Sequence, residues 1–262
     1  MTQPHVLYEI KNHVAIITLN RPEARNAFSH EMIALWNDCL KQARGDNTVR
    51  VIIVTGTGDT FCSGGDIREM AEGRLQSWDM KSFLWDMVHR IILTLEDLDK
   101  PVIAAINGAA IGAGMDMAIM CDMRVCSERA RLAEAYINMG LVAGDGGTYF
   151  LSRLVGTSRA LELLLTGNMI TPEQALQWGI VNRVVPHEDL MKETVALAET
   201  IANKPPLAVR MMKRAVYQAQ SSSLRSHLDY ISSQMGLLTE TADHREAAQA
   251  FLEKRAPVFT GK

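Results

Sequence analysis

Two short, unbroken apolar segments constrain the fold of this chain more than any other feature. Residues 51–54 read Val-Ile-Ile-Val, and residues 102–106 read Val-Ile-Ala-Ala-Ile. A strand with one face in water alternates apolar and polar residues, so continuous apolar runs indicate strands that are covered on both faces. Segments with helical spacing of apolar residues separate these strands, at 32–40 and 78–98. The alternation of strand and helix predicts the α/β fold class.

The N-terminal segment predicts a β-hairpin. Residues 5–10 and 13–19 carry Val, Ile and Tyr at strand-like spacing, and Lys11-Asn12 stands between them as a turn. Ser29 then offers an N-cap for the helix at 32–40. We therefore expect two strands and a helix before the first buried strand.

The last third of the chain is helical in pattern. Thr171, Pro172 and Gln174 form a typical helix start, with a cap, a proline in the first turn and an amide able to reach back. Further helices are expected up to residue 254, and their apolar faces are too large to stand alone in water. We expect them to pack on the α/β part or on another subunit. We accordingly divide the chain into a core, 1–200, and a C-terminal helical oligomerisation region, 201–262.

Charge and cysteine content exclude several classes of function. The chain has 262 residues, with 27 Lys and Arg against 30 Asp and Glu, a formal net charge of −3. Such a chain has no overall attraction for nucleic acid or for an anionic membrane, so an anionic ligand must be held locally. The four cysteines form no CxxC motif and no zinc-type spacing, which predicts core thiols, a reducing compartment and no metal site.

Neither a leader nor a membrane span is expected from the sequence. The first ten residues lack the basic and apolar segments of a signal peptide. The most apolar stretch, 101–121, is interrupted by Asn107, Asp116 and three glycines, which would be costly in a bilayer. We therefore expect a cytoplasmic protein without a membrane segment.

Two glycine-bearing turns follow the buried strands and open helices. The first, 61–67, reads Phe-Cys-Ser-Gly-Gly-Asp-Ile, and the second, 107–116, contains Gly108, Gly112 and Gly114. Glycine lets a backbone approach a ligand closely, and a helix start presents unpaired N–H groups. If the turns converge, they form a two-donor pocket for a developing oxyanion; if they do not, they are ordinary structural turns.

Four blocks of sequence resemble the crotonase (enoyl-CoA hydratase/isomerase) superfamily. They are Leu19-Asn20-Arg21-Pro22 with Asn26-Ala27, the turn at 61–67, the segment 101–108, and Gly146-Gly147-Thr148. The resemblance continues to Lys254-Arg255 and covers nearly the whole chain. It implies a crotonase-like ββα spiral with a C-terminal helical region, an acyl-CoA substrate, and no cofactor other than the coenzyme A of that substrate. It also implies a homotrimer or a dimer of trimers, and a place in fatty acid metabolism.

The resemblance assigns roles to individual residues and also shows departures. The family holds the thioester oxygen with two backbone N–H groups, which match Gly65 and Ala113 here. Ala113 stands where the family usually has glycine, so its Cβ narrows the approach. The two glutamates that handle water in hydratases of the family match Asp116, one methylene shorter, and Tyr136, which is no carboxylate. The two-glutamate hydration machinery is therefore not intact.

Three nearby residues are candidates to complete the site. Asp145 lies in a loop that borders the acyl pocket in the family, where isomerase and dehalogenase branches carry a working Asp, in some of them at the position of Gly144. His89 falls near the histidine of the chlorobenzoyl-CoA dehalogenase branch. Glu134 would share the face of Tyr136 in a strand but not necessarily in a helix or loop. Each has a structural alternative as a helix cap, a turn former, a packed ring or a surface charge.

A local basic cluster is expected for polyanionic coenzyme A. The resemblance places these residues on the coenzyme A side of the site: Arg21, Arg25, Ser63, Gly64, Asp66, Ile67, Arg68 and Lys254. In this family the tail that carries Lys254 approaches coenzyme A, often from a neighbouring subunit. Taken singly, each cation is more often a solvated surface charge.

The expected function is oxyanion-stabilised enolate chemistry on an enoyl-CoA thioester, either a double-bond shift or hydration. Asp116 and Asp145 are the candidates for proton transfer. The departure at Tyr136 favours the double-bond shift, because one carboxylate is enough to carry the proton. Two alternatives stay open: an acyl-CoA hydrolase or dehalogenase-like enzyme that uses Asp145, with His89 assisting, and a catalytically silent acyl-CoA binder.

Overall fold

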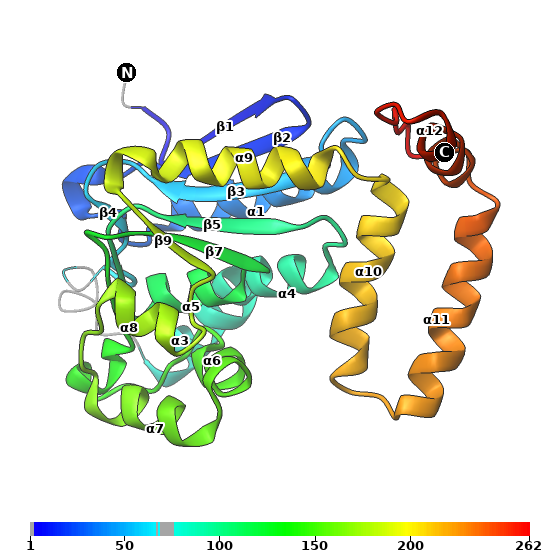
Figure 1. The fold of residues 1–262 in the computed structure, drawn as a ribbon. Helices are drawn as coiled ribbons and strands as arrows, with labels where there is room; N and C mark the ends of the chain where they lie inside the picture. Colours follow the sequence, from blue (N-terminus) through cyan, green and yellow to red (C-terminus); the bar gives the residue numbers. More distant parts are fainter. Residues whose placement is uncertain (1–2, 67, 69–75) are drawn as a thin grey trace.

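A computed structural model describes residues 3–66, 68 and 76–262, and its strands form two sheets (Figure 1). The main sheet has the order β1-β2-β3-β5-β7-β9. These strands are β1 (Val6–Lys11), β2 (Val14–Leu19), β3 (Val51–Gly56), β5 (Val102–Ile106), β7 (Met123–Ser127) and β9 (Arg183–Val185). Only the β1–β2 pair is antiparallel, and the other pairs are parallel. The α/β prediction and the N-terminal hairpin are thus confirmed, with the hairpin turn at Asn12 and His13.

Both faces of the main sheet are covered, as the continuous apolar strands predict. Val51 and Ile53 of β3 pack toward α9 (Leu190–Ala202), which lies across one face (Figure 1). Ile52 and Val54, on the opposite face, join the larger core. That core also contains residues of α1 (His30–Gly45), which begins after the predicted cap Ser29, and of α4 (His89–Asp97) and α5 (Ala113–Met120).

A second, three-stranded sheet positions the two glycine turns. It contains β4 (Thr60–Cys62), β6 (Ala109–Ile111) and β8 (Arg131–Ala133), in the order β4-β6-β8, and its pairs are parallel. Ala110 pairs with Cys62, and Ile111 pairs with Ala133. Since parallel strands end at a common edge, the segments that follow the three strands gather in one place.

The helix expected at 78–98 is continuous but changes its winding. It consists of α3 (Ser77–Phe83), a π-helical turn η2 (Leu84–Val88), and α4. Such π turns are rare and occur frequently at functional sites. The helix start expected near Asp66 lies mostly outside the described residues.

The remaining elements are helices, and most of them lie in the C-terminal part of the chain, where the sequence predicts a helical pattern. They are η1 (Pro22–Ala24), the 3-10 helix η3 (Ala135–Met139), α6 (Gly147–Val155), α7 (Thr157–Thr166), α8 (Pro172–Gln177), η4 (His187–Asp189), α10 (Pro206–Ala219), α11 (Leu224–Thr239) and α12 (Ala242–Glu253). The capping box of α8 at Thr171 and Gln174 is formed as predicted. Helices α10–α12 extend away from the sheets, on the side opposite to β4 (Figure 1). Their exposed apolar side chains include Met212, Leu228 and Phe251.

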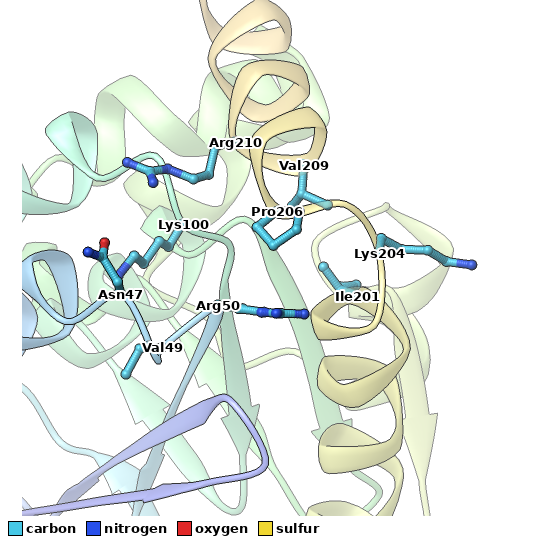
Figure 2. A pocket seen from close by; sticks show the side chains of 9 residues that line it. All are labelled: Asn47, Val49, Arg50, Lys100, Ile201, Lys204, Pro206, Val209 and Arg210. Carbon is cyan, nitrogen blue, oxygen red and sulfur yellow. The ribbon is translucent and has the colours of Figure 1, made fainter. Parts of the chain in front are cut away.

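A small cavity marks the junction between the core and this helical arm (Figure 2). Arg50, which lines it, donates hydrogen bonds to the carbonyls of Ala202 and Phe259 at 2.9 Å. Arg210 of α10 forms an ion pair with Asp99. The cationic side chains at this junction therefore tie the arm to the core.

Candidate active site at the edge of the small sheet

The two glycine turns touch each other at the edge of the small sheet. A Cβ on Gly64 would lie 2.8 Å from the Ile111 carbonyl oxygen and 3.1 Å from the Ala113 nitrogen. A Cβ on Gly114 would lie 2.0 Å from the carbonyl oxygen of Cys62, where no side chain fits. Glycine at these positions is what allows the two backbones to meet.

The two predicted donors are on these touching turns. Ala113 is the first residue of α5, where the N–H has no intrahelical acceptor. Within the described residues, no acceptor is found for the N–H of Ala113 or of Gly65. Within that part of the chain, both N–H groups are therefore candidates to bind an external oxygen atom.

A hydroxyl group joins two carboxyl groups beside these donors. The Tyr136 Oη atom lies 2.7 Å from Asp116 Oδ2 and 2.9 Å from Asp145 Oδ2. Asp116 stands in the first turn of α5, Tyr136 in η3, and Asp145 just before α6. The structure thus brings together three residues that the sequence analysis could only propose separately.

Glu134 completes the cluster, and it is as deeply buried as Asp116. Both side chains belong to residues with 0% exposure, and Asp145 is 4% exposed. Glu134 lies between β8 and η3 and contacts the Asp116 carboxyl group. The sequence left its orientation open because that depends on the conformation after β8. The three carboxyl groups and one phenol form what we call the acid cluster: Asp116, Glu134, Tyr136 and Asp145.

Burial shifts the protonation of every carboxyl group in the acid cluster. It raises the pKa of Asp116 to about 7, opposed by the Tyr136 hydroxyl and assisted by the charge of Asp145. Burial also raises the pKa of Asp145, opposed by Tyr136 and His89. Burial, followed by the charge of Asp116, raises the pKa of Glu134 to about 10. At neutral pH, Glu134 is therefore protonated and Asp116 populates both forms.

Two neighbours fix the geometry of the acid cluster. The start of α6 lies directly against Asp116, since a Cβ on Gly147 would be only 2.0 Å from Asp116 Oδ1. The Gly147 N–H accordingly lowers the pKa of Asp116. His89 Nε2 lies 2.8 Å from the Gly144 carbonyl oxygen, to which it donates. His89 thus anchors the loop that carries Asp145, because it binds the backbone carbonyl of Gly144 in that loop.

The residues predicted for coenzyme A binding divide into two groups. Arg21 is committed to Asp66 through an ion pair of 2.9 Å, whereas Arg25 is exposed beside Ser63, whose N–H donates to the Arg25 carbonyl. Arg68 is exposed, and its backbone N–H donates to Asp66 Oδ1. Ile67 lies outside the described residues.

Lys254 is remote from this group within one chain. It ends α12, on the opposite side of the molecule from β4 (Figure 1). A role for Lys254 in ligand binding therefore requires a second chain.

The described residues also bear on two other classes of site, metal centres and membrane-spanning helices. No group of three or more His, Cys, Asp and Glu side chains is placed to hold a metal ion in the described part of the chain. Over the same residues, no helix has both the length and the apolar character needed to cross a bilayer.

Comparison with known proteins identifies the family. A model of the enoyl-CoA hydratase/isomerase family matches residues 9–262. The chain is 36% identical over 258 residues to 1,2-epoxyphenylacetyl-CoA isomerase from Escherichia coli, with 98% of each chain covered. It is 37% identical to 2,3-dehydroadipyl-CoA hydratase from the same organism, over 96% of this chain and 97% of the relative. A crystal structure of enoyl-CoA hydratase from Bacillus anthracis superposes with a TM-score of 0.94 at 33% identity, over 98% of this chain and 100% of the other. The chain therefore belongs to the enoyl-CoA hydratase/isomerase family and has the crotonase fold expected from its sequence.

Proposed function

We propose that this protein shifts the double bond of an enoyl-CoA thioester through an enolate. The N–H groups of Gly65 and Ala113 hold the thioester oxygen and stabilise the negative charge that develops on it. One preorganised donor of this kind contributes about 10²–10³ in rate. The contact between the two glycine turns supports this role, because it sets both donors at one edge.

Asp116 carries the proton in this proposal. It removes a proton from the carbon next to the thioester, which places the electron pair in the enolate, and it returns a proton at the far carbon of the former double bond. Both forms of Asp116 are populated near neutral pH, as a residue that acts alternately as base and acid requires. The pairing of Tyr136 with Asp116 and Asp145 is the single observation that carries this assignment.

A double-bond shift is favoured over hydration by the composition of the acid cluster. Hydration needs one group to activate water and another to protonate carbon. Tyr136 stands where a hydratase of the family has its second glutamate, and its hydroxyl is already shared between Asp116 and Asp145. Relatives of similar identity are named both as isomerase and as hydratase, so the choice depends on these residues.

Incubation with several acyl-CoA thioesters in heavy water tests the proposal. The panel contains crotonyl-CoA, a 3-enoyl-CoA and a benzoyl-type CoA, and mass spectrometry follows the products. We expect the 3-enoyl-CoA to become a 2-enoyl-CoA with no added water, and with deuterium in the acyl chain to the extent that the proton on Asp116 exchanges with solvent between its removal and its return. Added water would instead indicate hydration, free CoA would indicate hydrolysis, and binding without any conversion would indicate a silent binder. Each of these results contradicts the proposed reaction.

We propose that the helical arm assembles the chain into a homotrimer or a dimer of trimers in the cytoplasm. Exposed apolar side chains along the arm support an association surface. The position of Lys254 supports a contribution to coenzyme A binding from a neighbouring chain. Light scattering coupled to size exclusion should give three or six chains, and Lys254→Ala should raise the KM for acyl-CoA. A monomer of full activity would contradict both statements.

A further inference from the structure

Glu134 is the acid-cluster residue for which the mechanism above gives no task. The Gly112 N–H donates to the Ala133 carbonyl at 2.8 Å, so the chain after β8 is held against the start of α5. Glu134 is 0% exposed there. Neither of its oxygens accepts a hydrogen bond from an N–H or hydroxyl group of the described residues, and its polar neighbour is the Asp116 carboxyl.

The number of protons available in the acid cluster determines the protonation state of Glu134. Tyr136 has one hydroxyl proton but two carboxyl neighbours, so it can donate to only one of them. An ionised Glu134 in this place would face Asp116 with no donor, and a buried unpaired carboxylate is costly. A protonated Glu134 has an acceptor at once, because the Asp116 carboxyl lies against it.

We propose that Glu134 is a positioning residue that retains its proton during turnover and donates it to Asp116, holding that carboxyl group against Tyr136. The effect on turnover rests on the proposed function. The retained proton does not, and it can be tested separately. The bond also stabilises ionised Asp116 and so keeps this group able to act as a base at neutral pH.

The surroundings of Glu134 contain no competing cation among the described residues that act on its carboxyl group. Asp116 faces it from α5, and Asp145 acts on it from the loop before α6. Beyond these lie the Tyr136 hydroxyl and His89, whose Nε2 is bound to Gly144. The Cys62 thiol of β4 is neutral, because burial raises its pKa to about 12.

Two substitutions separate the proton from the shape of the side chain. Glu134→Gln keeps a donor toward Asp116, whereas Glu134→Leu removes it at similar volume. We expect the pH midpoint of kcat on a 3-enoyl-CoA to stay at the wild-type value in Glu134→Gln. In Glu134→Leu it should move upward by about one pH unit, because Asp116 loses a stabilising hydrogen bond. An unmoved midpoint in Glu134→Leu would overturn the proposal, since a purely structural role lowers the rate without shifting the profile.

A measurement without substrate tests the retained proton itself. Because the folded chain holds a proton that the unfolded chain releases, wild type should lose stability relative to Glu134→Gln as the pH rises from about 5 to about 9. A pH-independent difference between the two proteins would overturn the proposal. If Glu134→Gln does not fold, the infrared carbonyl band of a protonated carboxyl group in wild type decides, and it should persist at about pH 8.5, above the midpoint of Asp116. If these tests succeed and no thioester is converted, the proposed function fails while the protonation of Glu134 stands.

Discussion

The buried cations Lys100 and Arg124 and the buried carboxyl group of Glu134 differ in their hydrogen-bond partners. Lys100, 2% exposed, donates to the carbonyls of Ala43 and Asp46 at 2.6 and 2.7 Å. Arg124, 4% exposed, donates to backbone carbonyls of the segments around it. Glu134 is at least as deeply buried, yet within the described residues no N–H or hydroxyl group reaches its oxygens.

We infer that the difference separates buried groups that stabilise the fold from buried groups that are available for chemistry. Buried polar groups are normally paired, and leaving one unpaired costs about 1–3 kcal/mol. This chain gives Lys100 and Arg124 carbonyl acceptors but gathers three carboxyl groups and one phenol in the acid cluster. Groups with strongly shifted pKa values are typical of functional sites. Substitutions on the two sides of this comparison should therefore act on different properties.

Removal of the Asp116 carboxylate should have the largest effect. Asp116→Asn keeps the volume but cannot accept a proton, so turnover of a 3-enoyl-CoA should fall by about 10²–10⁴-fold. Asp122→Asn is the matched control, because Asp122 forms an ion pair with Lys213 at 2.8 Å and lies outside the acid cluster. Steady-state kinetics on both variants checks the prediction. An Asp116→Asn enzyme with a tenth of wild-type turnover would remove Asp116 from the mechanism.

The pH profile of the wild-type enzyme should have its midpoint close to that of Asp116. Burial raises the pKa of Asp116 from 3.8 to about 7, and the reaction begins with the ionised form. Activity should therefore be lost as the pH falls through about 7, by roughly tenfold per pH unit on the acid side. Rates measured under conditions of constant ionic strength test this. A midpoint near 4 would show that Asp116 is an ordinary solvated carboxylate.

Lys100 should matter for stability and not for chemistry. Lys100→Met has a similar length but removes the ammonium group that donates to the carbonyls of Ala43 and Asp46, and of these two the Asp46 carbonyl keeps the Val49 N–H as a donor. The free energy of unfolding should decrease by about 2 kcal/mol, while turnover changes little. Urea unfolding and kinetics on the same preparation measure both. Unchanged stability would contradict the structural role assigned to buried cations.

Asp145 should show the reverse behaviour, with the smallest effect. Burial raises the pKa of Asp145, so the ionised form is disfavoured in the folded chain and stability decreases as the pH rises through this pKa. Asp145→Asn removes that loss and should add about 1 kcal/mol at alkaline pH while lowering turnover. Thermal unfolding at acid and alkaline pH tests the sign. Destabilisation at alkaline pH would place Asp145 among the structural carboxylates.

The sequence predicted the parts of the fold that local pattern controls. Continuous apolar runs located β3 and β5, and the capping residues located the starts of α1 and α8. The glycines after the two buried strands located the two turns that meet in the structure. Each of these depends on a few adjacent residues, so one sequence was sufficient.

The remaining features depend on register and packing. The strands β4, β6 and β8 have three residues each, too few to show a periodicity. The burial of Glu134 follows from their parallel pairing, which no local pattern reports. The π turn at Leu84–Val88 likewise has an ordinary helical sequence. The Tyr136 hydroxyl could be assigned to both carboxyl groups only once the loop at Asp145 was placed.

The shared hydroxyl of Tyr136 also limits how this chain can evolve. A glutamate at position 136, as in hydratases of the family, would add another acid to a space where Asp116, Glu134 and Asp145 already compete for protons. We therefore expect Tyr136→Glu alone to destabilise the folded chain, because it places a further carboxyl group in a buried space without a new donor. Replacing Glu134 or Asp145 by a neutral residue in the same variant should recover part of that loss, so a fourth carboxyl group fits only where one of the present three is given up.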